Sequence, residues 1–371
     1  MKRANDTFPH LGEFIVPPGA TLQEAIDDLG MTQADLATRT GLSAKTVNRI
    51  IHGHEPLTYE TAELLERVTG VPANLWNNLE SIYRARLARN RSREELAHAV
   101  GWIKGFPIDE LVARGAIEKP ADDVECAQAV LSFFGVGNRE QWEAVWLTPA
   151  VAFRKSEVFK GDPEGVATWL RLGERVARST DCRPFSKDKF VKTLGDIRGL
   201  TTDRPDVFVP KMKASCADAG VAVVFVPEIR SIPVSGAAYW LTPEKAIVQM
   251  TLRGETDAKF WFTFFHEAGH ILKHGKKEKF VDDGDAGGRQ ENEADKFAET
   301  FLIPTAEAKQ LPELKTREEI IKFAKAVGVA PGIVVGRLQN MGVLGRKAAE
   351  NDLKKTFKWN NHDAGVEITI G

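Results

Sequence analysis

The stretch of sequence that decides the fold is FFHEAGHILKHG, residues 264–275. It carries the pattern H-E-x-x-H within a run, Asp257–Lys273, that is predicted to form one helix. His266 and His270 are four residues apart, so both imidazoles point to the same side of that helix and can bind one metal ion. Glu267 stands where hydrolytic zinc sites place the carboxylate that takes a proton from water. We therefore expect His266 and His270 as metal ligands and Glu267 as a catalytic base.

A third ligand is offered by a second predicted helix, which contains ENEADKFAETFLIP at residues 291–304. Glu291 and Asp295 are four residues apart on it, so both can face the first helix. One carboxylate can bind the metal while the other accepts the spare N–H of a ligand histidine. With H-E-x-x-H upstream, we favour Glu291 as a ligand over Glu291 as a helix-capping acid. Glu293 is a rival ligand, but it lies on another side of the helix.

Two histidines and one glutamate leave a coordination position open to water, which is typical of catalytic rather than structural zinc. The cofactor expected is Zn²⁺, with Mn²⁺ as the other candidate. The E-x-x-x-D spacing of Glu291 and Asp295 resembles that of thermolysin-like zinc peptidases. His274 lies four residues beyond His270; it could contact substrate at the rim of the site, but we favour a histidine that merely ends the helix.

The two motifs together resemble the ImmA/IrrE metallopeptidase family, whose pattern is H-E-x-x-H followed by E-x-x-A-N/D-x-F-A and L-L-x-P. The resemblance extends over about residues 190–345. It implies a zincin-like domain in which His266, His270 and Glu291 bind the metal and Glu267 is the base. Several members cut a helix-turn-helix repressor, so a repressor is the implied protein substrate. Two departures are mild: Asp295 replaces the commoner Asn, and FLIP replaces LLMP.

A second pattern, MTQADLATRTGLSAKTVNRIIHG, lies at residues 31–53. The segment TQAD at residues 32–35 is a capping-box start for a short helix that ends at Gly41. Ser43 then caps a second helix, residues 44–52. Two short helices joined in this way are predicted to form a helix-turn-helix.

The second of these helices has the side chains that a recognition helix needs. Its apolar positions fall on one face, and its polar positions fall on the other. Arginine and lysine suit guanine edges, asparagine suits adenine, and hydroxyl side chains suit phosphate. The candidate DNA-binding residues are Gln33, Ser43, Lys45, Thr46, Asn48 and Arg49.

The pattern over residues 31–53 resembles the Cro/CI (XRE) family, and the flanks at residues 8–13 and 73–80 are similar to HigA-type antitoxins. This resemblance implies a homodimer that binds an inverted-repeat operator in double-stranded DNA near its own gene. It also implies a RelE/HigB-like toxin as a partner.

Composition describes an ordinary globular chain, with 43% hydrophobic and 27% charged residues. The formal net charge of −2 gives no overall attraction to nucleic acid, so DNA binding needs a local surface. The three cysteines are scattered without CxxC spacing, which indicates a reducing compartment. No apolar run is long enough to span a membrane, and no signal-peptide core follows Met1. We expect a cytoplasmic protein with no membrane association.

The rest of the chain indicates a mostly helical α+β protein of four segments. Residues 1–90 form the helix-turn-helix domain, which ends in a predicted helix at residues 72–89. Residues 91–185 are a helical connecting region without recognisable chemistry, which starts with a separate helix at residues 93–104. Residues 186–345 form the metallopeptidase domain, and residues 346–371 form a charged, loosely held tail.

Strands are predicted only beside the metal motif, at residues 221–226, 236–241 and 246–252, as a small antiparallel sheet. A peptide could add to its edge as an extra strand. Tyr239 could assist at the reacting carbonyl, although a core or surface position is favoured.

The function that combines these features is an autoregulatory, antitoxin-like transcriptional regulator with a zinc endopeptidase domain that cleaves a regulatory protein. The alternative is a HigA-type antitoxin whose metal domain is a non-catalytic sensor or a scaffold that binds toxin. A peptidase that does not bind DNA is the third hypothesis.

Overall fold

The computed structural model describes residues 16–147, 162–229, 232, 234–252, 256–275, 286–362 and 365–370. The chain divides into two compact units, one up to Val100 and one from Gly101 onward, and each is described by itself. The predicted class, mostly helical α+β, is confirmed. The flank at residues 8–13, which contributes to the antitoxin resemblance, lies outside the described residues. None of the helices in the described ranges has the length and apolar character needed to cross a membrane.

The first unit is a bundle of short helices around Trp76, which is fully buried. Thr32 and Asp35 form the predicted capping box at the start of α2, and Ser43 caps α3. Val47, Ile50 and Ile51 of α3 are buried in the core, as the apolar stripe predicts. The helices are α1 (Pro18–Asp28), α2 (Gln33–Thr40), α3 (Ala44–Ile51), α4 (Tyr59–Thr69) and the first part of α5 (Ala73–Ile103).

The long helix α5 corrects one prediction. Separate helices at residues 72–89 and 93–104 were expected, but one helix of 31 residues runs through both. The segment between them, Asn90 to Ser92, contains no glycine or proline, and the arginine, alanine and glutamate around it favour helix. The expected segment boundary at residues 90 and 91 therefore lies inside a continuous helix.

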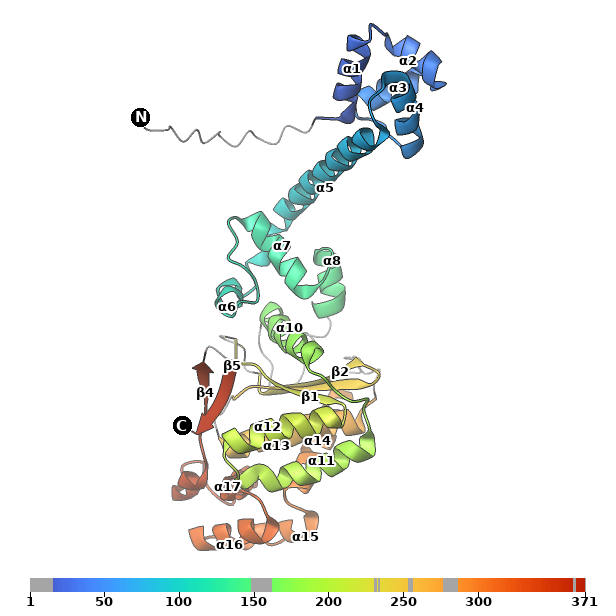
Figure 1. Ribbon diagram of the computed structural model, residues 1–371. Helices are drawn as coiled ribbons and strands as arrows, with labels where there is room; N and C mark the ends of the chain where they lie inside the picture. Colours follow the sequence, from blue (N-terminus) through green and yellow to red (C-terminus); the bar gives the residue numbers. More distant parts are fainter. Residues whose placement is uncertain are drawn as a thin grey trace, which may run out of the picture. The chain divides into compact units, whose positions relative to one another are not determined.

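The helical middle packs on the sheet of the second unit. Trp142, Trp146 and Trp169 are buried in one cluster with Val226 and Ala237, which come from the sheet region. The elements are α6 (Ile108–Ala113), α7 (Asp123–Phe134), α8 (Arg139–Trp142), the π-helix η1 (Glu143–Leu147) and α10 (Pro163–Ser179). In Figure 1, α10 covers one face of the sheet.

The sheet has three strands in the order β1 (Val221–Phe225), β3 (Lys245–Met250), β2 (Gly236–Thr242). The predicted sheet was antiparallel throughout; the hairpin β2–β3 is antiparallel, but β1 pairs with β3 in parallel. The reason lies in the connection after β1. It leads from β1 to β2, which runs antiparallel to β1 and leaves room for one strand between them. β3 follows β2 through a tight turn, fills that room and therefore runs parallel to β1.

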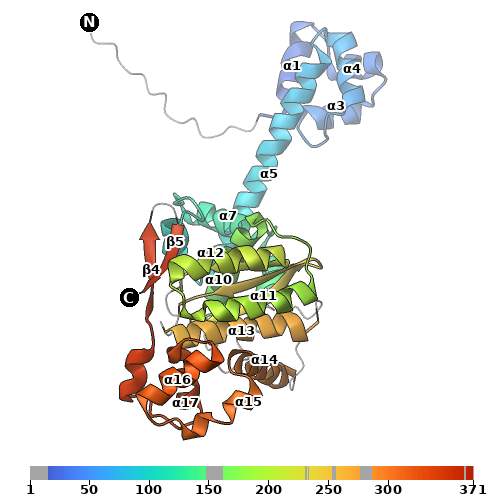
Figure 2. The same cartoon turned by 60° about the horizontal axis from the view of Figure 1, so that its bottom comes forward.

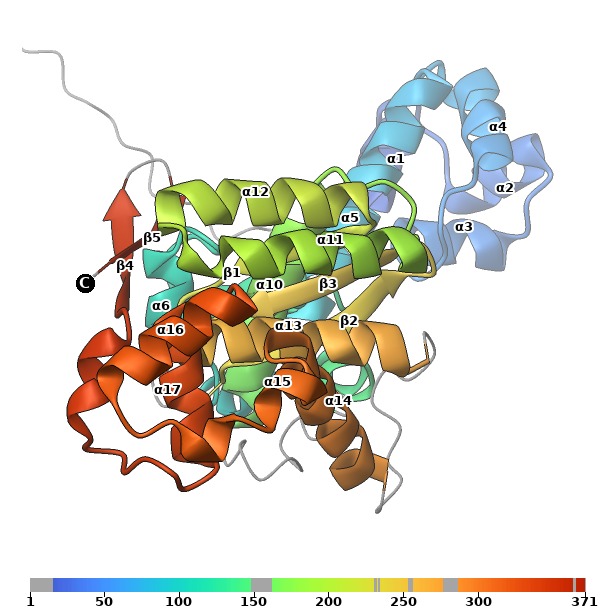
Figure 3. The same cartoon turned by 90° about the horizontal axis from the view of Figure 1, so that it is seen from below.

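The other face of the sheet is covered by α12 (Pro205–Asp218) and α13 (Asp257–Lys273), and α11 (Lys187–Gly199) packs against α12, as Figures 1 and 2 show. Helix α14 (Ala286–Leu302) crosses α13 on the side away from the sheet, which is clearest in Figure 3. The chain continues through α15 (Thr305–Ala308), the 3₁₀ turn η3 (Leu311–Glu313), α16 (Arg317–Val327) and α17 (Pro331–Asn340).

The described residues after Gly345 include regular elements, where the sequence predicts a loosely held tail. The 3₁₀ turn η4 (Ala349–Leu353) leads into an antiparallel hairpin of β4 (Phe357–His362) and β5 (Gly365–Ile370). Another 3₁₀ turn, η2 (Leu200–Thr202), follows α11 earlier in the chain. Phe357 and Ile368 are buried in the same core as α12 and α13. In the sequence, the charged residues of this segment obscured the two apolar side chains that pack in the core.

Candidate metal centre and DNA-binding surface

Helix α13 carries the H-E-x-x-H motif at the predicted bounds, Asp257–Lys273. Its start is capped by the Thr256 side chain, which accepts a hydrogen bond from the Lys259 backbone. Phe264, Phe265 and Ala268 are fully buried in the domain core. Because most of the helix surface is covered, the helix holds His266 and His270 in a fixed direction, toward α14.

Small residues bring α14 close to α13. A Cβ atom added at Gly269 would lie 3.1 Å from the Phe297 ring and 3.3 Å from the Ala294 Cα atom. Ala294 and Ala298 of α14 are fully buried in this contact. Because the two helices are so close, Glu291, one turn before Ala294 on α14, lies beside His266 and His270.

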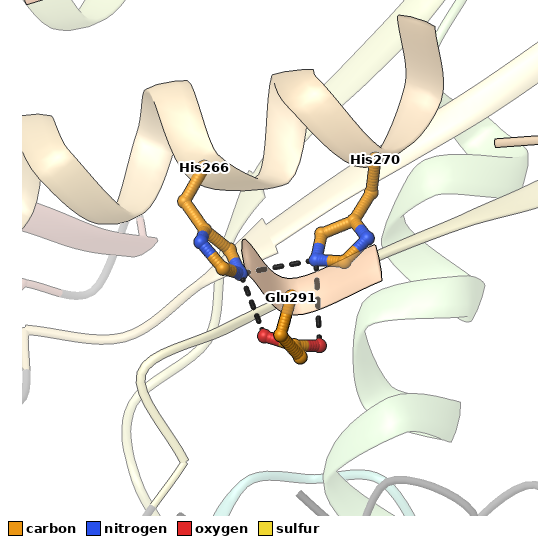
Figure 4. A group of neighbouring side chains, drawn as sticks. All are labelled: His266, His270 and Glu291. Atoms are coloured by element: carbon orange, nitrogen blue, oxygen red, sulfur yellow. Dashed lines mark hydrogen bonds and ion pairs between the residues drawn. The ribbon is translucent and has the colours of Figure 1, made fainter. Parts of the chain in front are cut away.

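Three donor atoms converge at this contact (Figure 4). The Nε2 atoms of His266 and His270 are 3.0 Å apart. The Glu291 carboxylate places one oxygen 3.1 Å from His266 Nε2 and the other 3.5 Å from His270 Nε2. Ligand atoms of a tetrahedral zinc ion are about 3.3 Å apart, given bonds of about 2.0–2.1 Å. The spacing and the donor types therefore fit one Zn²⁺ ion.

The outer nitrogen of His266 faces a carboxylate. His266 Nδ1 is 2.8 Å from Asp295 Oδ1, so that the ring can donate to Asp295 while its Nε2 atom faces the metal site. Burial disfavours the charged form of His266, but the hydrogen bonds to Asp295 and Glu291 outweigh it and raise the pKa of this imidazole to about 10. Burial, together with His266, lowers the pKa of His270 to about 4. The two imidazoles thus differ because only His266 has a carboxylate on its outer nitrogen.

Glu293 does not join the three donors. Its carboxylate accepts a hydrogen bond from Arg289 at 2.9 Å, and its other oxygen is 3.7 Å from His274 Nε2. His274 is the residue whose contacts were missed from the sequence. It does end α13, but its Nδ1 atom also lies 2.9 Å from His270 Nδ1. The spacing of four residues between His270 and His274 was the signal in the sequence that could have predicted this contact.

Glu267 lies on the sheet side of the motif. Its side chain is 7% exposed, and burial raises the pKa of its carboxyl to about 7. A Cβ atom added at Gly236 of β2 would lie 2.7 Å from Glu267 Oε1, so the strand passes directly against this carboxylate. Tyr239 of the same strand points elsewhere: its hydroxyl donates to the Leu170 carbonyl at 3.2 Å, toward α10.

The candidate DNA-binding residues fall into three groups, the last of which is Arg49 alone. Lys45 is exposed, and the Asn48 side chain donates to Gln33 Oε1 at 3.3 Å, so α2 and α3 present these amides together. Ser43 and Thr46 are engaged with each other, because the Ser43 hydroxyl accepts the Thr46 backbone N–H at 3.0 Å and lies 2.9 Å from the Thr46 hydroxyl.

The Arg49 side chain is bound by two residues of the first unit, Glu55 and His54. Its Nε atom is 3.0 Å from the Glu55 carboxylate, and its guanidinium also donates to the His54 carbonyl at 3.3 Å. The structure thus directs this side chain to the loop after α3, a contact that the sequence pattern did not reveal.

Comparison with protein families finds two matches. Residues 22–76 match the helix-turn-helix family, and residues 239–339 match the peptidase family described as the IrrE N-terminal-like domain. No curated protein and no solved structure matches the chain. The matches thus define a chain with one helix-turn-helix region and one metallopeptidase-like region. The chain combines an XRE-type helix-turn-helix with an IrrE/ImmA-like domain, the combination predicted from its motifs.

Proposed function

We propose that the second unit is a zinc-dependent endopeptidase in which His266, His270 and Glu291 hold the metal and Glu267 handles the proton. The observation that carries this proposal is the convergence of three donor atoms within 4.8 Å of one another, with a buried carboxylate at the next residue of the helix. Zinc is favoured over other divalent ions by two imidazoles and one carboxylate, and Mn²⁺ is the alternative.

The residues of the site have different roles in peptide hydrolysis. Zn²⁺, when bound, supplies a Lewis acid that polarises the scissile carbonyl and acidifies water. Glu267 takes the proton from the attacking water and delivers it to the leaving amine. Its burial against β2 keeps this carboxyl in one place for both transfers. Asp295 accepts the outer N–H of His266 and so fixes the direction of that ring.

The substrate that fits this site is an extended segment of a protein. Strand β2 is at one side of the sheet order and passes beside Glu267 at Gly236. An extended peptide that adds to β2 would place its backbone next to the base. We propose a regulatory protein as the substrate, and a helix-turn-helix repressor in the first place.

The first unit, in this proposal, binds an inverted-repeat operator in double-stranded DNA as a homodimer. Lys45, Asn48 and Gln33 present their polar groups on the exposed side of α2 and α3, where a recognition helix contacts bases. We further propose antitoxin-like autoregulation in the cytoplasm, with a RelE/HigB-like toxin as the partner.

Metal binding tests the ligand set first. The purified full chain should hold about one Zn²⁺ ion after dialysis, measured by elemental analysis. His266→Ala, His270→Ala and Glu291→Ala should each lose it. Glu293→Ala is the matched control, because this acid lies two residues from Glu291 outside the three donors, and it should keep the metal. Retention of stoichiometric zinc by Glu291→Ala would show that another side chain is the third ligand.

Cleavage tests the activity. The zinc-loaded protein is incubated with candidate repressors and with itself, and products are followed by mass spectrometry. Glu267→Gln preserves shape and metal but removes the base, so cleavage should fall by about 10²-fold or more. If the wild type binds zinc and operator DNA but cleaves none of these proteins, the metal domain is a sensor or scaffold instead.

A further inference from the structure

His270 has an outer nitrogen that meets a second histidine, whereas the outer nitrogen of His266 meets an acid. The distances are 2.9 Å from His270 Nδ1 to His274 Nδ1 and 2.8 Å from His266 Nδ1 to Asp295 Oδ1. Each inward nitrogen, Nε2, faces the other and the Glu291 carboxylate. His274 therefore stands at the same place relative to His270 as Asp295 does relative to His266.

The backbone explains how His274 reaches this place. Helix α13 ends at His274, whose φ of −103° and ψ of 154° are extended. Its backbone N–H still donates to the His270 carbonyl at 3.1 Å. The side chain folds back along the last turn, so that the two rings lie 4.9 Å apart and the His274 side chain is only 11% exposed.

The proton positions follow from the proposed zinc site, on which this inference rests. If His270 binds zinc through Nε2, its Nδ1 atom carries the ring proton and must donate. Only one proton fits between two nitrogens 2.9 Å apart, so His274 Nδ1 must accept and His274 must carry its proton on Nε2. That Nε2 atom is buried and makes no hydrogen bond among the described residues; the Glu293 carboxylate is 3.7 Å away, on the proton-bearing side.

We infer that His274 is a positioning residue for the metal site: a neutral imidazole that accepts the outer N–H of His270 and fixes this ligand in the tautomer that presents Nε2. A ligand histidine without such an acceptor can turn or place its proton on the inward nitrogen. Outer partners of this kind change metal affinity by about 10–100-fold. Glu293, the rejected ligand, then favours the His274 tautomer whose proton points away from His270.

The test uses two substitutions with nearly the same shape. In His274→Asn the amide oxygen can take the position of Nδ1 and accept the same N–H, whereas His274→Leu puts a methyl group there. Zinc affinity of the full-length protein is measured by competition with a chromophoric chelator, and the Co²⁺-loaded protein is measured by visible absorption. His54→Leu, an exposed histidine of the other unit, is the control.

We expect His274→Leu to weaken zinc binding by about 10–100-fold and to alter the Co²⁺ spectrum, while His274→Asn and His54→Leu stay close to the wild type. A residue that only supported the fold would give no rescue by Asn and no spectral change in the folded, cobalt-saturated Leu variant. Equal affinity of His274→Leu and the wild type, or equal losses in Leu and Asn, overturns the inference alone. A wild type that binds no zinc overturns the proposed function with it.

Discussion

Gly236 determines where the Glu267 carboxylate can lie. A Cβ atom at this position would be 2.7 Å from Glu267 Oε1 and 2.7 Å from Thr263 Cγ2, and both neighbours belong to the tightly packed helix α13. Since β2 cannot retreat without breaking its pairing with β3, the carboxylate would have to move.

We predict that Gly236→Ala reduces peptidase activity by about 10²-fold, because the base is displaced from the water it must deprotonate. Zinc content should remain near that of the wild type, since the three proposed ligands meet at α14 and none of them is a neighbour of the Gly236 Cβ position. Thr242→Ser, at the exposed end of the same strand, serves as the control. Normal activity in Gly236→Ala would mean that Glu267 does not act from its observed position.

At the scale of elements, the loop after helix α3 places an acid, Glu55, beside Arg49, which we propose as a DNA-contacting side chain. Arg49 and Glu55 are 47% and 40% exposed, so their ion pair contributes at most about 1 kcal/mol. We predict that Glu55→Gln strengthens operator binding by up to about 5-fold, because it frees Arg49 and removes a negative charge near phosphate.

The matched control is Glu63→Gln, which removes an exposed acid paired with Arg67 on α4 and should leave affinity unchanged. Arg49→Ala should abolish the gain. Fluorescence anisotropy with a selected operator, over a series of salt concentrations, measures both effects. If Glu55→Gln binds no more tightly than Glu63→Gln, the ion pair does not restrain Arg49.

The start of helix α13 contains a buried acid, Asp257. One carboxylate oxygen accepts the Ala258 N–H at 2.8 Å, the other has no hydrogen-bond partner in the described structure, and Gly332 packs against both. Burial raises the pKa of Asp257 from 3.8 to about 6, although Lys354 and Lys355 oppose the shift.

Asp257 should therefore make folding less favourable as the pH rises. The unfolded chain loses this proton near pH 4 and the folded chain near pH 6, so the folded state holds the extra proton between them and stability falls across this window. Relative to Asp257→Asn, the free energy of unfolding of the wild type should drop by on the order of 3 kcal/mol between pH 4 and 7. Urea unfolding of both proteins at several pH values measures it; a constant difference would contradict the assignment.

The elements differ in how far the sequence could predict them. Helix α13 matched to the residue, because its apolar periodicity, Thr256 cap and glycine stop agree. The approach of Glu291 to the histidines followed from spacing alone. The partners of Arg49 and His274 did not, because they depend on which way a long or terminal side chain turns once the fold is complete. The same holds for the parallel pairing of β1, which requires knowing that β3 fills a space left earlier.

At the scale of the whole molecule, the two units have separate hydrophobic cores, one around Trp76 and others within the second unit. We predict that operator affinity is the same in His266→Ala and the wild type, and that zinc stoichiometry is the same in Asn48→Ala/Arg49→Ala and the wild type. Both are measured on the full-length protein, by anisotropy and elemental analysis. Loss of operator binding in His266→Ala would show that the metal site controls the helix-turn-helix.

The hairpin β4–β5 closes the second unit far along the chain from the helix that it supports. Thr356 bridges to Thr256 at the start of α13, and the Asp257 N–H donates to the Lys355 carbonyl. During translation, Val100, the last residue of the first unit, is added about 270 residues before Ile368. At about 5–20 residues per second this is a delay of roughly 15–50 s. In that interval each nascent chain can have a folded helix-turn-helix while the helix with the H-E-x-x-H motif still lacks its last support.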